Sequence, residues 1–165
     1  MYPWRWLLLC CFLHSPTIAA EISTAGATFD VQDEWALIGQ PTQEQFTLRS
    51  VRRGVEINVL VQRAPKINEN NVETATTQLL GEAVRTHERS AQQRKLTLAD
   101  VETKVSKVQR DWAGEFIGRD SSGHRFHQLV LVRPGRIVAI YADSKNQPPE
   151  VLLSAIIELV SGIKE

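Results

Sequence analysis

The segment at residues 128–142 (QLVLVRPGRIVAIYA) constrains the fold of this 165-residue chain more than any other stretch. Its two apolar runs flank Pro134-Gly135, a pair that is typical of the central positions of a tight turn. A two-residue turn makes the two strands antiparallel and fixes which residues share a face. One face carries Leu129, Leu131, Val138 and Ile140, and the other carries Val130, Val132, Ile137, Ala139 and Tyr141. Because an antiparallel pair usually exposes one polar face to water, two apolar faces indicate a covering layer on each side.

Two amphipathic helices are predicted to supply these layers. The first covers residues 72–91, where apolar residues recur at helical spacing. Asn70 and Glu73 have the spacing of a capping box at its start, and Gly81 is tolerable inside it if the backbone packs closely on the sheet there. The second helix opens at Pro148, with a proline and an acid suited to its first turn. Its apolar stripe consists of Val151, Leu152, Ala155, Ile156, Leu159, Val160 and Ile163.

Most of the remaining chain has strand patterns. Strands are predicted at residues 27–31, 45–50, 55–62, 96–108, 112–119 and 125–132, and Trp35, Leu37 and Ile38 are expected to return the chain to the core. Strands, helix, strands and helix follow one another without the regular β-α-β alternation that a parallel sheet needs. The sequence therefore predicts a single α+β domain at residues 21–165, with an antiparallel sheet of about six or seven strands sandwiched between two helices.

Residues 1–20 have the pattern of an export signal that is removed from the mature protein. The apolar run at residues 6–13 is far shorter than the ~20 residues of a spanning helix, and small residues allow cleavage after Ala19 or Ala20. The alternative is a short buried helix, which the prolines near both ends of the run disfavour. We therefore expect a periplasmic protein whose mature form has no membrane span.

The cysteine content and the charge exclude several classes of function. Cys10 and Cys11 both lie in the predicted signal, so the mature chain would have no disulfide, thiolate nucleophile or cysteine-bound metal. The chain has 19 basic and 19 acidic residues, and removal of the signal with Arg5 leaves 18 against 19. Nucleic-acid binding and polybasic membrane binding require a clear positive surplus, so neither partner is predicted.

The histidines of the predicted domain do not form a recognisable metal site. His124 and His127 lie close together, but residues three apart on one strand point to opposite faces, so they are interpreted as surface histidines beside a hairpin turn. His87 lacks the second histidine of a helical zinc-protease motif and is expected to pack at the edge of the apolar stripe.

No pattern of a catalytic or cofactor-binding site stands out either. Glu115 is expected to form a surface ion pair with Arg119, because no second acid is placed across a cleft from it. The Ser-Ser-Gly at residues 121–123 lacks the setting of a nucleophile elbow and is predicted to be a turn. We therefore predict no catalytic residue, no cofactor and no metal.

Four arginines form the one candidate partner surface. Arg49, Arg52, Arg53 and Arg63 lie around one predicted hairpin and could meet an acidic partner. The alternative is that they are solvated charges which keep the edges of the sheet unpaired.

The order of elements resembles the PsbP-like fold and, within it, small exported bacterial proteins of the DcrB-like type. The features that carry the resemblance are Phe29-Asp30-Val31 and Trp35, the strand pair at 46–62, the helix at 75–83, Gly114 and Gly123, the strand at 137–141, and the last helix with Ile156 and Ile163. DcrB-like proteins are commonly lipid-anchored, but Leu9 before Cys10 is not the small residue that lipid attachment requires. The resemblance implies a protein-binding or accessory role at the cell envelope and no catalytic residues.

The function predicted from these observations is that of an exported, non-enzymatic envelope protein that binds another protein. One alternative is an immunity-type inhibitor of an exported toxin. Another is a small hydrolase that uses Glu115, His124 or His127, and a third is a carrier of an apolar ligand held between sheet and helix.

Overall fold

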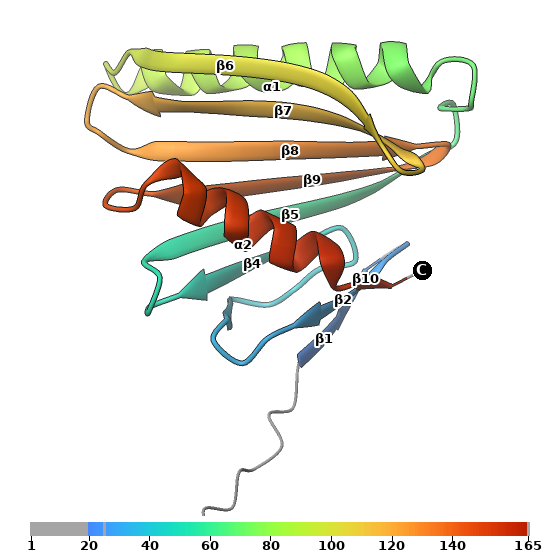
Figure 1. Ribbon diagram of the computed structural model, residues 1–165, viewed down its shortest axis with the longest axis horizontal. Helices are drawn as coiled ribbons and strands as arrows, with labels where there is room; N and C mark the ends of the chain where they lie inside the picture. Colours follow the sequence, from blue (N-terminus) through green and yellow to red (C-terminus); the bar gives the residue numbers. More distant parts are fainter. Residues whose placement is uncertain (1–19, 25, 165) are drawn as a thin grey trace, which may run out of the picture.

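The computed structural model describes residues 20–24 and 26–164 (Figure 1). The predicted signal lies outside these residues, except for Ala20. Twelve elements follow one another: β1 Ala20–Ser23, β2 Thr28–Val31, β3 Ala36–Ile38, β4 Gln45–Ser50, β5 Val55–Ala64, α1 Val72–Gln93, β6 Leu98–Val108, β7 Asp111–Asp120, β8 Arg125–Arg133, β9 Gly135–Ser144, α2 Pro149–Ser161 and β10 Ile163–Lys164. Within the described chain, no helix is both long and apolar enough to cross a membrane.

Seven strands form one antiparallel sheet in the order β3-β4-β5-β9-β8-β7-β6. The β8–β9 hairpin stands near its centre, and its register places Leu131 opposite Val138 with Pro134 and Gly135 in the turn. Gly135 has a φ of 80°, a conformation that glycine adopts without steric cost. The register predicted from the Pro-Gly turn is confirmed, as is the α+β class.

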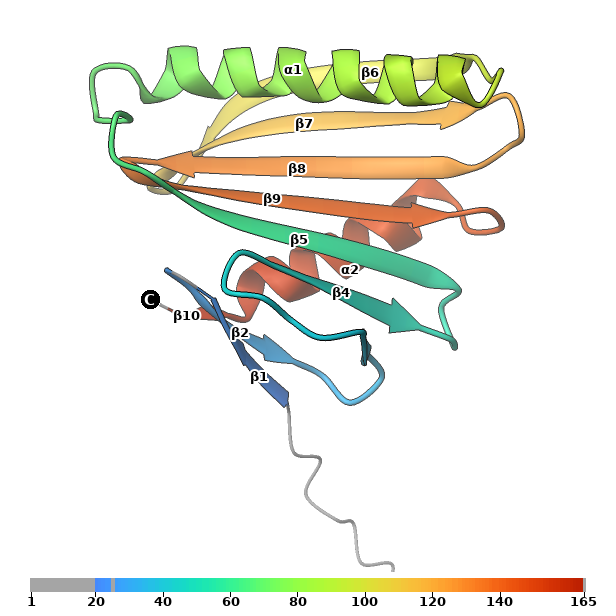
Figure 2. The ribbon, with the colours of Figure 1, turned by 180° about the vertical axis from the view of Figure 1, so that it is seen from behind.

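The two helices lie on opposite faces of this sheet. Figure 1 shows α2 in front of the sheet, and Figure 2, from behind, shows α1 in front. Val72 of α1 packs against Val130 and Val132, and α2 packs into the cluster that contains Leu129 and Leu131. We call these faces the α1 side and the α2 side. The predicted covering of both apolar faces is confirmed.

Each helix covers only part of its face. Helix α1 packs on β6, β7 and β8, whereas α2 packs on β8, β9 and β5. On the α1 side, the surface formed by β5, β4 and β3 therefore lies beyond the helix (Figure 2).

A small second sheet, in the order β1-β2-β10, extends the cover on the α2 side. Phe29 of β2 is fully buried and meets Phe46 of β4 edge-on, with ring centroids 5.0 Å apart. Apolar spacing predicted that Ile163 continues the last helix. This prediction is wrong, because Ile163 belongs to β10 and pairs with Phe29. The chain leaves α2 through Gly162, where a Cβ atom would lie only 2.5 Å from the backbone oxygen of Asp30. The close approach of α2 to β2 therefore requires glycine at this position.

Three local predictions are wrong. Leu37 and Ile38 lie outside the core on the edge strand β3, with exposed fractions of 40% and 39%, and of the three residues only Trp35 returns to the core. The capping box of Asn70 and Glu73 is not formed, because the residue before the helix is Asn71 and no side chain caps the helix. The Asn71 amide instead binds the loop before the helix. The backbone of α1 does not pack closely on the sheet at Gly81, where a Cβ atom would meet only the side chain of Arg85.

The close approach of α1 to the sheet is found at Gly114 of β7. A Cβ atom there would lie 3.3 Å from Cβ of Leu80, whereas a Cβ at Gly81 would meet only the end of the Arg85 side chain at 3.5 Å. The sequence placed the glycine of the contact in the helix, but it lies in the strand beneath it.

His87 packs in an aromatic cluster between α1 and the sheet. Its ring centroid lies 5.0–5.2 Å from those of Phe116, Phe126 and Tyr141, and its Nδ1 is 3.1 Å from the oxygen of Ala83. Burial lowers the pKa of His87 below its usual 6.5, against the bond to Ala83, which raises it. A packed histidine was predicted here.

We predict that acid destabilises the protein partly through His87. The unfolded chain binds a proton at this histidine more readily than the folded chain does, so stability is full above pH 6.5 and falls as the pH drops below it. The variant His87→Phe should lose less unfolding free energy than the wild type between about pH 7.5 and 5. Urea unfolding at a series of pH values measures this slope, and equal slopes in the two proteins would contradict the role given to His87.

The two glycines of the helical regions should respond oppositely to alanine. Gly81→Ala should raise the unfolding free energy by about 1 kcal/mol, because the helix gains propensity and the methyl group meets only a flexible side chain. Gly162→Ala should lower it by roughly 1–3 kcal/mol, because the methyl group collides with the backbone of Asp30. Chemical denaturation measures the unfolding free energy of both variants. A change of the same sign in both would contradict the packing described for the two glycines.

Candidate binding surface at the β4–β5 turn

Three of the four predicted arginines gather at one end of the β4–β5 hairpin. Arg49 lies near the end of β4, and Arg52 and Arg53 lie in the turn that follows. Arg63 lies near the other end of β5, about 26 Å along the strand from Val55, where it stands opposite Arg136 in the backbone register with β9. The structure therefore brings Arg49, Arg52 and Arg53 together and leaves Arg63 apart from them.

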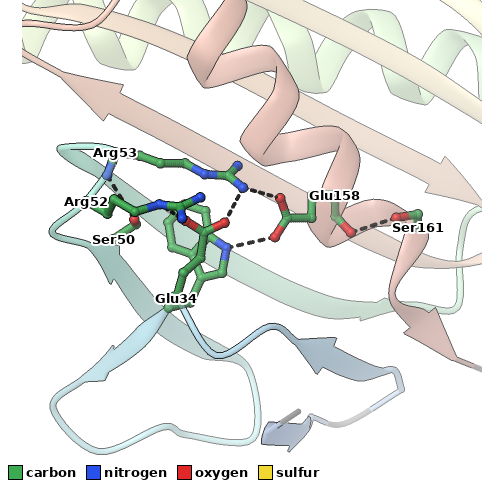
Figure 3. A network of polar contacts seen from close by, with 7 residues as sticks. Glu34, Ser50, Arg52, Arg53, Glu158 and Ser161 are labelled. Carbon is green, nitrogen blue, oxygen red and sulfur yellow. Dashed lines mark hydrogen bonds and ion pairs between the residues drawn. The ribbon is translucent and has the colours of Figure 1, made fainter. Parts of the chain in front are cut away.

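Arg53 ties the turn to two other parts of the molecule (Figure 3). Its Nη2 lies 2.7 Å from Oε2 of Glu158 in α2 and also donates to Oε1 of Glu34, and its guanidinium stands 5.6 Å above the Trp35 ring. Trp35 Nε1 donates to the other oxygen of Glu158 at 3.0 Å, and the Arg53 amide donates to Ser50 Oγ at 3.1 Å. The network joins the turn, the segment before β3 and α2.

The charges of this network are largely removed from water. The side chains of Arg53, Glu34 and Glu158 are 20%, 16% and 18% exposed. Burial alone would lower the pKa of Arg53, but hydrogen bonds and charge from the two glutamates outweigh it and raise the pKa. Arg53 is therefore a charged link inside the molecule, and most of its surface is closed to a partner.

Val51 and Arg52 form the exposed tip of the turn. Val51 is 85% exposed and the Arg52 side chain 81%, with Nε of Arg52 3.4 Å from Oε2 of Glu34. Arg49 makes a 2.6 Å ion pair with Glu56 across the hairpin. Because all three arginines have a carboxylate partner, the tip presents the apolar Val51 beside the exposed side chain of Arg52 and not a strongly basic patch.

An open depression of about 450 Å³ lies beside the tip. Its wall includes the Arg49–Glu56 pair and a second pair, in which His124 Nε2 lies 3.6 Å from Oδ2 of Asp143. Burial raises the pKa of Asp143, and so does the charge of Glu56, against His124 and Arg49, which lower it. Ser144 Oγ donates to the Gly54 oxygen at 2.6 Å and fixes the turn to the end of β9.

His127 and Glu115 form a separate pair on the α2 side. His127 Nε2 lies 2.8 Å from Glu115 Oε1, although its angle falls outside hydrogen-bond geometry. Burial lowers the pKa of His127, against the raising effect of the carboxylate. His127 is only 4% exposed, so its interpretation as a surface histidine is wrong.

The expected Glu115–Arg119 pair is also wrong, because Arg119 binds Asp100 and Glu115 turns to His127. Arg119 reaches Asp100 at the irregular start of β6, where the register shifts between Ala99 and Glu102. Periodicity gives no sign of this bulge. His127 and Glu115 are diagonal neighbours in the β7–β8 register, where Ile117 stands opposite His127 and Leu129 opposite Glu115. Three residues, 121–123, separate the bonded Asp120 and His124, so counting outward from a turn at 120–123 gives a register that is wrong by one residue.

His124 and His127 have different carboxylate partners and do not converge. Across residues 20–24 and 26–164, no three side chains of the metal-ligating types gather into a possible metal site.

Sequence comparison and structure comparison give different answers for this chain. No family model matches the sequence, and no curated protein matches it. The solution structure of cyanobacterial PsbP (CyanoP) from Synechocystis is similar in structure, with a TM-score of 0.60 and 10% identity over 95% of this chain and 98% of that one. A crystal structure from Bacteroides thetaiotaomicron has a TM-score of 0.46 and 6% identity over 89% of this chain and 48% of that chain, a likeness too low to indicate a shared fold. The chain has a PsbP-like fold.

The buried network should contribute more to stability than its exposed neighbour does. Arg53→Met removes the buried cation that joins Glu34 to Glu158, so the unfolding free energy should fall by roughly 1–3 kcal/mol. Arg52→Met is the matched control, and it should change the unfolding free energy by no more than about 0.5 kcal/mol because the side chain is exposed. Urea denaturation of both proteins tests the difference, and equal losses would show that Arg53 is no structural link.

Proposed function

From the PsbP-like fold and the exposed turn, we propose that this chain is a non-enzymatic protein of the cell envelope that acts by binding another protein through the β4–β5 turn. The observation that carries the proposal is the exposure of Val51, 85%, at the tip of a turn that is fixed on both sides. A single exposed apolar side chain is common on protein surfaces, but this one stands at a rigid tip beside an exposed arginine and an open depression, and that combination supports contact with a partner.

The chemistry around Val51 suits a protein interface. Arg52 beside it is exposed, and arginine is enriched at interfaces with apolar anchors. The neighbouring depression offers space for a side chain of the partner. Because Arg53 and Ser144 hold the turn, little conformational freedom would be lost when a partner binds. The partner surface should offer an apolar pocket for Val51 and a carboxylate for Arg52.

Export is part of the proposal and rests on the pattern of residues 1–20. The periplasm then supplies the partner, in keeping with the proposed relation to DcrB-like proteins. The hydrolase alternative gains no support from the His127–Glu115 pair, because His127 is buried and a substrate could not reach its ring without movement of the sheet.

A crosslinking experiment at two valines tests the proposal. A photo-crosslinking residue at position 51 should capture one defined protein from envelopes of cells that express the native gene. The same residue at position 108 is the matched control, because Val108 is also exposed but lies at the end of β6 across the sheet. We expect a product at 51 and none at 108.

Charge variants then test the role of the tip. Val51→Asp with Arg52→Glu should weaken binding of the captured protein at least tenfold, since two contacts of the interface centre are lost. Lys107→Glu with Val108→Asp should leave binding unchanged. Thermal unfolding of both double variants confirms that they are folded. Unaltered binding by the tip variant would refute the assignment of the interface.

A further inference from the structure

A row of polar side chains on the α1 side begins at the rim of helix α1, where Tyr141 packs on His87, and crosses to the strands beyond the helix. Thr47, Asn58, Tyr141 and Gln128 stand in register on the neighbouring strands β4, β5, β9 and β8. Since neighbouring strands lie about 4.8 Å apart, the row is about 14 Å long and runs across the strands. Sequence periodicity does not reveal it, because its members come from four separate segments.

A groove of about 320 Å³ lies along this row. Besides the row, its wall includes Gln40 and Gln45, and Leu60 and Ala139 stand side by side in the next register row. None of the residues that line the groove is an aspartate, glutamate, lysine or arginine. The groove is thus rich in amide and hydroxyl groups, has an apolar strip, and is uncharged.

Polar groups of the row are left for a ligand. Thr47 Oγ1 donates to Asn58 Oδ1 at 2.8 Å, which fixes the orientation of that amide. Gln128 Oε1 is buried and has no hydrogen-bond partner within the described residues. Burial, together with the charge of Asp143, raises the pKa of Tyr141, so its phenol keeps its proton and can donate. A buried polar atom without a partner destabilises a protein unless something else binds it.

From these features we propose that the groove binds a neutral saccharide. Sugar hydroxyls both donate and accept hydrogen bonds, as the amides and hydroxyls of the row do, and the carbon face of a sugar ring fits the apolar strip of Leu60 and Ala139. A row about 14 Å long accommodates two linked rings. The site is distinct from the protein-binding turn, and neither function depends on the other.

The lining disfavours other classes of ligand. A charged ligand would lose water without meeting an opposite charge in the groove, because the charged residues Arg49, Glu56 and Asp143 stand one register row further toward the turn. A peptide that adds a strand would pair along the free edge of β3, whereas this row runs perpendicular to the strands and away from that edge.

Titration of the purified full chain with neutral disaccharides, followed by NMR of its backbone amides, tests the proposal. The probes are N,N′-diacetylchitobiose, cellobiose, maltose and lactose. At least one should cause saturable shifts confined to β4, β5, β8 and β9 around the row. Chitobiose, which carries protonated amines in place of the acetamides, should bind at least tenfold more weakly than its acetylated form. The proposal is overturned if none of the four neutral sugars gives saturable shifts or if the shifts map elsewhere. It is also overturned if chitobiose binds as tightly as N,N′-diacetylchitobiose does.

Matched variants separate the groove from the rest of the sheet. Gln128→Leu and Tyr141→Phe each remove one hydrogen-bonding group at similar size and should weaken binding roughly 5–10-fold. Gln62→Leu removes the same kind of amide from the same face of β5 outside the groove and should have no effect. Gln128→Leu should not unfold the protein, because the oxygen it removes has no partner. Equal affinities of all three variants and the wild type would also refute the site.

Discussion

The removal of both faces of one antiparallel hairpin from water is the constraint on which this structure depends. Val130 and Val132 on one side and Leu131 and Ile140 on the other are buried, so neither face of the β8–β9 hairpin can be left to solvent. One layer cannot cover two faces, and the chain therefore needs a helix on each. The central position of the hairpin follows from the same requirement, because edge strands have fewer neighbours to bury both faces.

The two covers are offset from each other, and this offset creates the surfaces with which the molecule can act. Helix α1 packs over β6, β7 and β8, and α2 packs over β8, β9 and β5, so the two overlap only near the hairpin. The open part of the α1 side holds the neutral groove, and the charged rows next to it lead to the β4–β5 turn. On the α2 side, Glu158 connects the helix to Arg53 and Trp35. A helix that stabilises the core therefore also fixes the orientation of the turn.

Local patterns in the sequence were sufficient for the centre of the fold. Pro134-Gly135 determined the register of the hairpin, and apolar periodicity located both helices. The failures have a common physical origin, because they depend on contacts between distant segments. Ile163 continues the helical stripe but pairs with Phe29, and Leu37 and Ile38 are apolar but lie on an edge strand.

The candidate site shows the same limit of local patterns. The four arginines were close in sequence, yet the length of β5 separates Arg63 from the others. Arg53 resembles its neighbour Arg52 in every local respect, and only the position of Glu158 makes it a buried link. His127 was placed at the surface because its position diagonal to Glu115 depends on the pairing of β7 with β8, which local periodicity does not give. The polar row of the groove required the order of four strands before it could be seen.

The small sheet in which β10 pairs with β2 has a consequence for the order of folding. It joins the first and last parts of the described chain, so its formation closes a loop that contains nearly all the other elements. Closing this loop costs the least conformational entropy once the large sheet has formed, because the intervening chain is then already ordered. Its few hydrogen bonds should form late and open first, and their amide protons should exchange with solvent well before those of β5 and β9.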